Sequence, residues 1–426
     1  MTDKPIAIIG GGLSGLTCAL RLSEHGKEVH LYESAPSLGG RTRSFYDSNV
    51  NQWVDNGPHL LIGAYQATGQ LLQDIGASGN VTWQDSLHLP LWDARRGRFV
   101  LQPKPWLPFP AALLLSLLHL PGHHMQSVRA MLRIARAMRA PTDETVADWL
   151  SRLQIPTQLQ RDLIEPLCLG TMNEAMTGAN SKSFVRVLSE AFASHRAARL
   201  GWFNQPMSQA LINPLAEQIQ QLGASILTAT GIRKIEQQDG QYRLYTNRGD
   251  SGPYSAVVVA LPAHARNRLL EIEAHVETGA ITNVHLWFEA GIRLPEPLIG
   301  GIGTYSQWFF DVSTQTGEKD LSHICAVISA ESPTDRSDTL QSVRDELAQL
   351  LQVKLPDPVH SKIVCEQRAT VLTKAVNKSF ADGMLIDASE APQPGDLPAT
   401  IEAAVIRGEE AAKVLCLQRS RDVIHR

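Results

Sequence analysis

A glycine-rich turn between a short apolar strand and a helix is the feature that most constrains the fold of this chain. Ile6–Ile9 is a continuous apolar run, the pattern of a strand that is buried on both faces. A helical pattern follows the turn, and a second strand over 28–32 ends the unit. The turn carries three glycines in the spacing G-x-G-x-x-G, at Gly10, Gly12 and Gly15. This order predicts a β-α-β unit of a doubly wound α/β fold.

Each glycine of this turn has a mechanical reason. Gly10 permits the tight turn, Gly12 lets the backbone approach a pyrophosphate, and Gly15 lets the helix pack closely on the strand. The helix start, at Leu13 and Ser14, offers free N–H groups and the positive end of the helix dipole to the phosphates. The turn therefore predicts a dinucleotide site.

Two further segments extend this predicted site. Glu33, with Ser34 beside it, stands eighteen residues after the last glycine, where a carboxylate accepts hydrogen bonds from an adenosine ribose. A second glycine pair with a basic residue follows at Gly39, Gly40 and Arg41. This pair suits another close pass of backbone along the same pyrophosphate, which an extended FAD requires and simple NAD dehydrogenases lack. FAD is the expected cofactor.

Composition excludes several other classes of protein. The chain has 426 residues, with 39 Lys and Arg against 43 Asp and Glu. Charged residues make up 19%, below the typical quarter or so, which argues against disorder or a coiled coil. There is no long basic run, so nucleic acid is not an expected partner.

The cysteines and the N-terminus point to a reducing compartment. The five cysteines are scattered and include no CxxC pair, so neither a disulfide framework nor a metal site is predicted. Residues 1–5 lead directly into the first strand and leave no room for a signal peptide. We expect a cytoplasmic protein.

Beyond the glycine motifs, the chain resembles the flavin amine oxidase and phytoene desaturase superfamily. The residues that carry this likeness are the two glycine segments, Glu33 and the segment 55–59, Asp-Asn-Gly-Pro-His. Within the superfamily the chain resembles the bacterial hydroxysqualene dehydroxylases, squalene-associated FAD-dependent enzymes of hopanoid pathways. The stretches that resemble this group run from end to end of the chain, at 55–65, 165–169, 307–311, 366–370 and 397–402.

The resemblance implies a Rossmann-like FAD-binding domain of the amine oxidase or glutathione-reductase type, with an inserted α+β substrate domain containing an antiparallel sheet. We assign 1–85, 206–265 and 370–426 to the FAD-binding domain, and 86–205 and 266–369 to the substrate domain. Strand patterns are predicted at 226–228, 232–236, 242–246, 256–262, 281–288, 307–311 and 324–329, and helices at 206–222 and 339–351.

The resemblance also implies further cofactor contacts. Gly57, Pro58 and His59 stand where the family's chain passes the isoalloxazine ring, and Ile232 would lie near the adenine. Asp387 fits the aspartate of a Gly-Asp-Trp-Thr sequence in the family. Here the preceding glycine is replaced by isoleucine and the following loop is altered.

A helix start near the C-terminus is the expected site of the flavin ring. The sequence Leu-Pro-Ala-Thr-Ile at 397–401 precedes a helical pattern that we expect to end near Gly408. Its N-terminal dipole would stabilise the negative charge of a reduced flavin at N1 and O2. Ala399, Thr400 and Ile401 are the candidate ring contacts; the alternative is an ordinary helix start with Thr400 near the cap.

An apolar segment in the middle of the chain has two interpretations. Residues 111–120 are almost all hydrocarbon, yet a span of the bilayer needs about twenty residues. The segment is either a core helix or a peripheral membrane contact or lid over a lipid pocket, with Trp106 beside it. Four arginines at helical spacing follow and would share one face: Arg129, Arg133, Arg136 and Arg139. With the cytoplasmic expectation, this places the protein peripherally on the inner face of the cell membrane.

If the resemblance holds, the reaction is reductive removal of the allylic hydroxyl of hydroxysqualene, a C30 isoprenoid, to give squalene for hopanoid or sterol-type triterpenes. The hydride would come from N5 of reduced FAD, whose own electron donor the sequence does not name. An acid must protonate the departing hydroxyl. His59 is the first candidate, and Tyr65 and the pair Glu366 and Arg368 are alternatives; structural roles for all four stay open.

Three other functions stay open. A carotenoid or phytoene-type desaturase would transfer hydride the other way, from polyene to oxidised FAD. An amine oxidase fits the apolar middle region less well. A flavin-free isoprenoid-binding escort protein would explain the altered loop 386–396.

Overall fold

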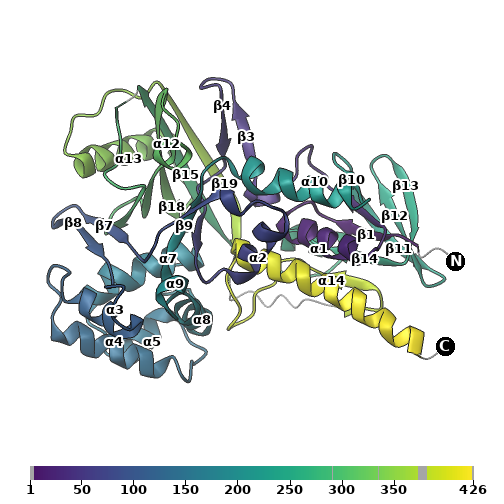
Figure 1. Cartoon of the computed structure of the whole chain (residues 1–426), viewed down its shortest axis with the longest axis horizontal. Helices are drawn as coiled ribbons and strands as arrows, with labels where there is room; N and C mark the ends of the chain where they lie inside the picture. The colour runs from purple at the N-terminus through teal and green to yellow at the C-terminus, as the bar shows by residue number, and fades with distance from the viewer. Residues whose placement is uncertain (1–3, 290, 334, 373–380, 425–426) are drawn as a thin grey trace.

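The computed structural model describes residues 4–289, 291–333, 335–372 and 381–424. Figure 1 shows two regions side by side: a parallel sheet with its helices, next to both chain ends, and a region made of a second sheet above a group of helices. Residues 1–3, 373–380 and 425–426 of the predicted FAD-binding domain lie outside the described residues.

The parallel sheet confirms the predicted Rossmann-like architecture. Neighbouring strands pair in parallel except at one edge, where β20 and β21 are antiparallel. Helix α1 (Leu13–Glu24) follows the glycine turn, and α10 (Asn213–Gln221) packs against it. In spatial order the strands are β10 (Ser225–Leu227), β2 (Val29–Tyr32), β1 (Ile6–Ile9), β14 (Ala256–Val259), β21 (Leu385–Asp387) and β20 (Ala381–Asp382).

A three-stranded meander packs on this sheet where the alternating strand patterns predicted one. Its strands are β11 (Ile232–Gln238), β12 (Gln241–Thr246) and β13 (Gly249–Tyr254). The predicted helix at 206–222 begins as a π-helical turn at Ser208–Ile212 and continues as α10, which ends before Gly223.

The last helix corrects a prediction. Helix α14 does not end near Gly408 but runs over Ile401–Ile424. A Cβ atom at Gly408 would lie 2.4 Å from the backbone oxygen of Ser14 and 2.8 Å from the Cβ of Thr17. Glycine is therefore needed here for the close approach of α14 to α1, and it does not terminate the helix.

The second sheet has seven strands and contains all three strands predicted for this part of the chain. It is antiparallel except for one parallel pair, β7 with β16. Helix α13 (Arg336–Leu351) starts three residues earlier than predicted, because the Asp335 side chain caps it. In spatial order the strands are β19 (His360–Val371), β15 (Thr278–Glu289), β18 (Leu321–Ser329), β17 (Trp308–Asp311), β16 (Leu298–Ile302), β7 (Leu89–Asp93) and β8 (Gly97–Leu101).

The helices beneath this sheet share a large apolar core with it, in which Trp149 and Phe184 are fully buried. The apolar segment predicted at 111–120 is observed as α3, and Arg139 lies beyond the end of α4, so the predicted face of four arginines holds three. No helix in the described residues is long and apolar enough to cross a bilayer. The main helices are α3 (Phe109–Leu117), α4 (Met125–Ala137), α5 (Val146–Arg152), α7 (Glu165–Met172) and α8 (Ser181–Ala191).

Candidate active site

The glycine turn after β1 has the tight geometry that its spacing predicted. Gly10 has a φ of +114°, which side chains rarely adopt, and a Cβ there would lie 2.3 Å from the backbone oxygen of Ala260. A Cβ at Gly15 would lie 2.0 Å from the backbone oxygen of Gly10. Both positions require glycine because neighbouring backbone occupies the space of a side chain.

Gly12 differs from its neighbours because the space beside it is open. A Cβ there would meet nothing within 4 Å, and its φ of −76° suits any residue. Gly39 forms a β-bridge with Gly12 and donates its N–H to the oxygen of Gly11 at 2.8 Å, so the second glycine pair lies against the first. Helix α1 has no side-chain cap. An open glycine before an uncapped helix start fits a pyrophosphate.

Glu33 sits at the end of β2, beside this turn. One carboxylate oxygen accepts the N–H of Gly11 at 2.7 Å, and the other accepts the N–H of Ala35 and the hydroxyl of Ser34. The backbone N–H of Thr230 donates to the backbone carbonyl oxygen of Glu33, which brings the start of β11 at Ile232 close to Glu33. Glu33, the predicted ribose contact, and Ile232, the predicted adenine contact, therefore lie close to each other.

The chain just after β21 reaches the start of α1 from the far end of the sequence, and α14 begins a little further on. Ser14 donates its hydroxyl to the backbone oxygen of Ala388 at 2.9 Å. The hydroxyl of Thr400 accepts the N–H of Ala403 at 3.1 Å and so caps α14. Ala399 is half-buried and Ile401 is buried. This cap is what we expected if 397–401 were an ordinary helix start. Contact of Ala399, Thr400 and Ile401 with a cofactor ring stays a prediction.

Asp387 is engaged by protein groups. Its carboxylate pairs with the guanidinium of Arg266 at 2.9 Å and accepts the N–H of Ser389 at 2.9 Å. Both charged side chains are fully buried. This ion pair holds the end of β21 against α11 (Ala263–Leu269), and a direct cofactor contact of Asp387 stays a prediction.

Two arginines give the site positive charge. Arg41 pairs with the buried carboxylate of Glu390 at 2.6 Å and donates to the backbone oxygen of Ala369. Arg407, on α14, was missed by the sequence analysis. Its buried Nε atom has no hydrogen-bond partner among the described residues. Burial lowers the pKa of Arg407. The carboxylate of Glu390 raises this pKa, whereas the positive charge of Arg41 lowers it. A buried guanidinium nitrogen without a partner among the described residues is suited to an anion.

A cavity of about 560 Å³ lies between the sheet and the segment that contains His59. Its lining includes Trp53, Asp55, His59 and Trp202, and most of the segment 312–320. Polar and apolar side chains both face this space, with Lys319 and Asp320 exposed beside it. The cavity is therefore not a purely hydrocarbon pocket.

Two buried histidines of the second sheet also line this cavity, and the sequence analysis missed them. Nδ1 of His285 lies 3.0 Å from Nε2 of His323, and Trp287 stacks on His323 with ring centres 4.2 Å apart. Burial lowers the pKa of His285 to about 4 and that of His323 well below its usual value. Both rings are thus neutral at pH 7. Their strands, β15 and β18, are far apart from His59 in sequence, so no spacing rule connects them.

The acid candidates differ in their surroundings. Burial lowers the pKa of His59, whose Nδ1 lies 3.0 Å from the backbone oxygen of Gly57. Burial raises the pKa of Asp55 to about 6, although the Ser44 hydroxyl and the Met207 N–H both donate to it. Asp55 therefore holds a proton under mildly acidic conditions, unlike an ordinary aspartate.

Asp55 was not predicted as an acid. The predicted alternatives to His59, namely Tyr65 and the pair Glu366 and Arg368, are not among the residues that line this cavity. Burial raises the pKa of Tyr65, which hydrogen bonds to Thr400 at the start of α14. Arg368 is exposed, and its backbone N–H, not its guanidinium, donates to Glu366 at 3.3 Å. In the described residues no group of three or more His, Cys, Asp and Glu could hold a metal ion.

Comparison with known proteins agrees with this geometry. Residues 13–368 match the model of the family described as flavin-containing amine oxidoreductase. Hydroxysqualene dehydroxylase of Sinorhizobium fredii is 26% identical over 96% of this chain and 97% of its own length. That of Rhodopseudomonas palustris is 25% identical over 97% and 98%. The 15-cis-phytoene desaturase of Capsicum annuum is 23% identical over 68% of this chain and 54% of its own.

Solved structures share the fold. An oxidoreductase from Methanosarcina mazei has a TM-score of 0.75 at 15% identity, covering 96% of this chain and 100% of its own. Cyclohexylamine oxidase from Brevibacterium oxydans has a TM-score of 0.69 at 16% identity, covering 98% and 100%. The open glycine, the uncapped helix and the unpartnered Nε of Arg407, all within the described residues, fit a flavin dinucleotide.

Proposed function

The chain belongs to the flavin-containing amine oxidoreductases, and from that premise we propose that it is an FAD-dependent enzyme that reduces hydroxysqualene to squalene. When bound, reduced FAD supplies the hydride. The allylic hydroxyl leaves as water after it takes up a proton, and the hydride replaces it on carbon. The product would supply hopanoid or sterol-type triterpene synthesis. What carries the proposal is the end-to-end likeness to two proteins named for this reaction.

Open space at Gly12 supports FAD over a shorter flavin, because a pyrophosphate needs that room. Gly12 leaves room for a pyrophosphate, and Glu33 lies beside it at the expected ribose position. Arg41 and Arg407 would balance the negative charge of the phosphates or of the reduced ring. We assign the remaining contacts to the predicted residues of the two glycine segments, of 57–59 and of 399–401.

The polar cavity suits the hydroxyl end of such a substrate. His59 remains the first candidate for the group beside the hydroxyl, and its lowered pKa favours a neutral ring that donates or accepts a hydrogen bond. Asp55 is a second candidate for the proton itself, since its pKa is near 6. An acid with a pKa near the working pH is the more effective proton donor.

The hydrocarbon part of the substrate requires an apolar surface that continues from this cavity. Trp202 and Val312 line the cavity and also pack against the apolar core of the helices. Leu60, next to His59, packs against the same core. A carbon chain lying along these residues would keep water away from the allylic cation formed when the hydroxyl departs.

A phytoene-type desaturase is the second candidate, because relatives with that name match two thirds of the chain. The two functions differ in the direction of hydride transfer. A desaturase would take hydride from a polyene and form conjugated double bonds, whereas the dehydroxylase forms a product without added conjugation.

The test is anaerobic incubation of chemically reduced holoprotein with hydroxysqualene, followed by mass spectrometry of the extracted lipid. We expect squalene, with deuterium on one carbon when the flavin is reduced in deuterated solvent. New conjugated double bonds on a polyene substrate, or a purified protein without flavin absorbance, would contradict the proposal. The variants Asp55→Asn and His59→Gln each remove one candidate proton donor. We expect the single-turnover rate to lose its pH dependence only in the variant that lacks the actual donor.

The low water solubility of the proposed substrate also favours a location of the enzyme at a membrane. A C30 alcohol partitions into bilayers, so we propose that the protein attaches peripherally to the inner face of the cell membrane.

A further inference from the structure

The surface of α3, α4 and the segments beside them carries an unusual amount of exposed hydrocarbon. In the described part of the chain twelve large apolar side chains are exposed, and five of them lie between residues 106 and 132. We call the surface they form the α3–α4 surface. Its apolar members, with their exposed fractions, are Trp106 (76%), Leu115 (45%), Leu118 (37%), Met125 (56%) and Leu132 (53%).

The spacing of these residues puts them on the outer faces of two helices. Leu115 and Leu118 are three residues apart on α3 and at its C-terminal end, while Leu113 and Leu117 point into the core. Met125 and Leu132 are seven residues apart on α4, whose buried face includes Ala130 and Ile134. Residues three, four or seven apart share one face of a helix. Both helices therefore present hydrocarbon outward as well as inward.

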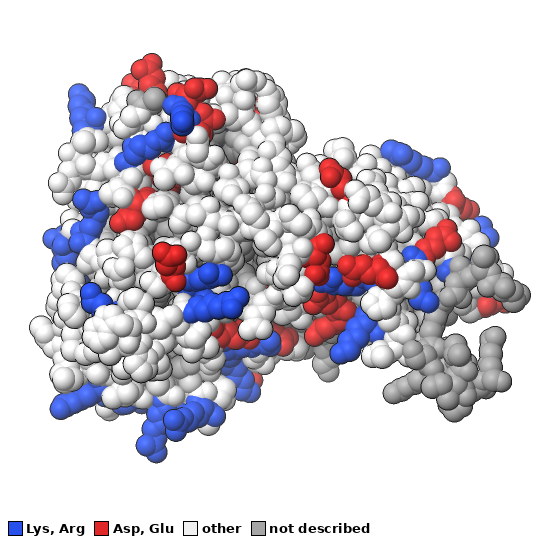
Figure 2. Space-filling model, in the orientation of Figure 1, with Lys and Arg blue, Asp and Glu red and all other residues white. Residues whose placement is uncertain are grey.

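The same surface is basic. Arg129, Arg133 and Arg136 are exposed on α4 between and beside the apolar residues, and Arg139 is exposed just after it. No Asp or Glu occurs between Asp93 and Asp143. Apart from Arg96, which pairs with Asp93 and Asp162, that stretch holds seven Lys and Arg, at 95, 98, 104, 129, 133, 136 and 139. The whole chain has a net charge of −4, so positive charge is concentrated here. Figure 2 shows Lys and Arg along the lower edge, below the helices that Figure 1 labels α3 to α5.

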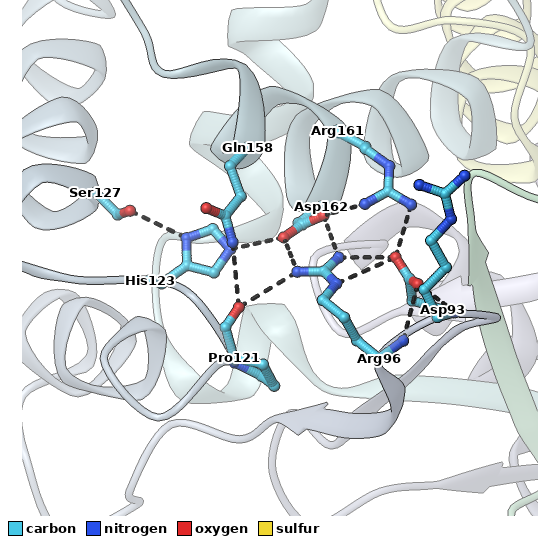
Figure 3. A network of polar contacts seen from close by, with 9 residues as sticks. Asp93, Arg96, Pro121, His123, Ser127, Gln158, Arg161 and Asp162 are labelled. Atoms are coloured by element: carbon cyan, nitrogen blue, oxygen red, sulfur yellow. Dashed lines mark hydrogen bonds and ion pairs between the residues drawn. The ribbon is translucent and has the colours of Figure 1, made fainter.

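A buried polar network holds this surface in place. His123, in the loop between α3 and α4, lies 2.9 Å from the carboxylate of Asp162, and its other ring nitrogen lies 3.0 Å from the hydroxyl of Ser127. Arg96 joins Asp162 to Asp93 through paired contacts (Figure 3). The loop between the helices is thus fixed to the β7–β8 hairpin, so the exposed side chains project from a rigid base.

We propose that the α3–α4 surface is a docking site for an anionic lipid bilayer. Exposed Trp and Leu side chains gain free energy when they enter the interface between headgroups and acyl chains. Arginines among them attract anionic headgroups, each contributing about 1 kcal/mol near a charged bilayer. A protein partner of ordinary composition has no need of both features, whereas an anionic membrane supplies the complement of each.

The location of the surface gives docking a purpose, which rests on the proposed function. Phe109, Leu113 and Leu117 of α3 belong to the apolar core that also contacts Leu60 and Leu397, next to the predicted cofactor residues. A bilayer touching α3 would therefore lie against the same apolar core that contacts these residues. Docking there would bring a water-insoluble isoprenoid to the enzyme within the lipid that dissolves it.

The test is flotation of the full-length holoprotein with vesicles of phosphatidylcholine alone or with about a third phosphatidylglycerol. We expect binding to the anionic vesicles that weakens as salt rises from 0.05 to about 0.5 M. A charge variant, Arg129→Gln with Arg136→Gln and Arg139→Gln, should bind at least about tenfold more weakly. Arg133 is left unchanged because it donates to the backbone oxygens of Leu153 and Gln154.

An apolar variant, Trp106→Ala with Leu115→Gln and Met125→Gln, should also lose binding. The matched control is Arg243→Gln with Arg248→Gln and Arg336→Gln, exposed arginines elsewhere that remove the same charge. Equal loss in this control, or no vesicle binding by the unchanged protein, would overturn the proposal. So would a dimer in solution that the apolar variant dissociates, because a second copy would then cover the surface.

Turnover with detergent-dispersed hydroxysqualene separates this proposal from the enzymatic one. Docking variants should keep that turnover while losing turnover of vesicle-bound substrate. If the unchanged protein floats with anionic vesicles but converts no substrate in either form, the proposed reaction fails and the docking surface stands.

Discussion

The glycine turns of the parallel sheet depend on single residues, whereas the helices under the second sheet depend on the overall distribution of side chains. Around Gly10 and Gly15 single residues are required, because backbone oxygens lie about 2 Å from where a Cβ would be. Around α3 and α4 no single residue is required, and what matters is how apolar and basic side chains are distributed over a surface. Close backbone approach is specified residue by residue, whereas a surface is specified by composition and spacing.

Gly12 gives the strongest test of this contrast. Gly12→Val should leave the protein folded, because its Cβ meets no protein atom, but should reduce bound flavin below about a tenth of normal. Absorbance at the flavin maximum relative to that at 280 nm measures the content. Gly15→Val is the comparison, since its Cβ collides with the Gly10 oxygen and should lower stability itself. Full flavin content in folded Gly12→Val would refute the role of this turn.

Asp162 tests the rigid base of the helical region. Asp162→Asn removes a fully buried carboxylate that pairs with Arg96 and His123, which should cost about 3 kcal/mol of unfolding free energy. Urea unfolding followed by tryptophan fluorescence measures the loss. Glu144→Gln, which breaks an exposed pair with Arg152, is the control and should cost less than about 1 kcal/mol. Equal losses in the two variants would show that the network adds nothing through burial.

The pH dependence of stability should differ in sign between the two regions. The folded protein keeps a proton on Asp55 up to about pH 6, whereas the unfolded chain loses it near pH 4. The folded state then binds more protons in that window, so stability should fall by roughly 3 kcal/mol as pH rises from 4 to 6. Asp55→Asn, whose amide oxygen can still accept from Ser44 and Met207, should remove this fall.

Asp162 provides the opposite case. Burial alone would raise its pKa, but hydrogen bonds from His123 and Arg96 outweigh burial and lower the pKa to about 2. Its contribution to stability is therefore present above pH 4 and is lost as the pH falls toward 2. Unfolding curves of the unchanged protein and the two asparagine variants between pH 2 and 7 measure both effects. A pH profile that Asp55→Asn leaves unaltered would contradict the raised pKa of Asp55.

Gly408 tests whether close approach also governs the last helix. Gly408→Ala adds a Cβ 2.4 Å from the Ser14 oxygen, so α14 must move away from α1 at a cost of about 1 to 3 kcal/mol. Thermal unfolding of the holoprotein measures it. The same change at Gly69, inside α2 (Gln66–Asp74), should stabilise slightly instead, because a Cβ there would meet nothing within 4 Å. If both variants behaved alike, helix propensity rather than packing would explain Gly408.

Several parts of this molecule were accessible from the sequence because their causes are local. The strand, glycine turn and helix at 6–24 and the meander at 232–254 follow from period and turn chemistry. The helix end predicted at Gly408 was wrong. Glycine can either terminate a helix or allow a neighbouring helix to approach closely, and only the position of α1 shows that the second applies here. Arg139 fell outside α4 for a related reason, since periodicity does not mark where a helix ends.

The cavity could not have been predicted, because its lining comes from strands and loops far apart in the chain. His285 and His323 lie on neighbouring strands and line the same cavity as His59 only because of tertiary packing. Local spacing by itself determined the dinucleotide turn, the fold class and the apolar character of α3, because backbone sterics and side-chain periodicity act within a few residues. Tertiary structure alone decided which buried groups share a cavity and how each one titrates, since burial and charge depend on neighbours that the linear order does not reveal.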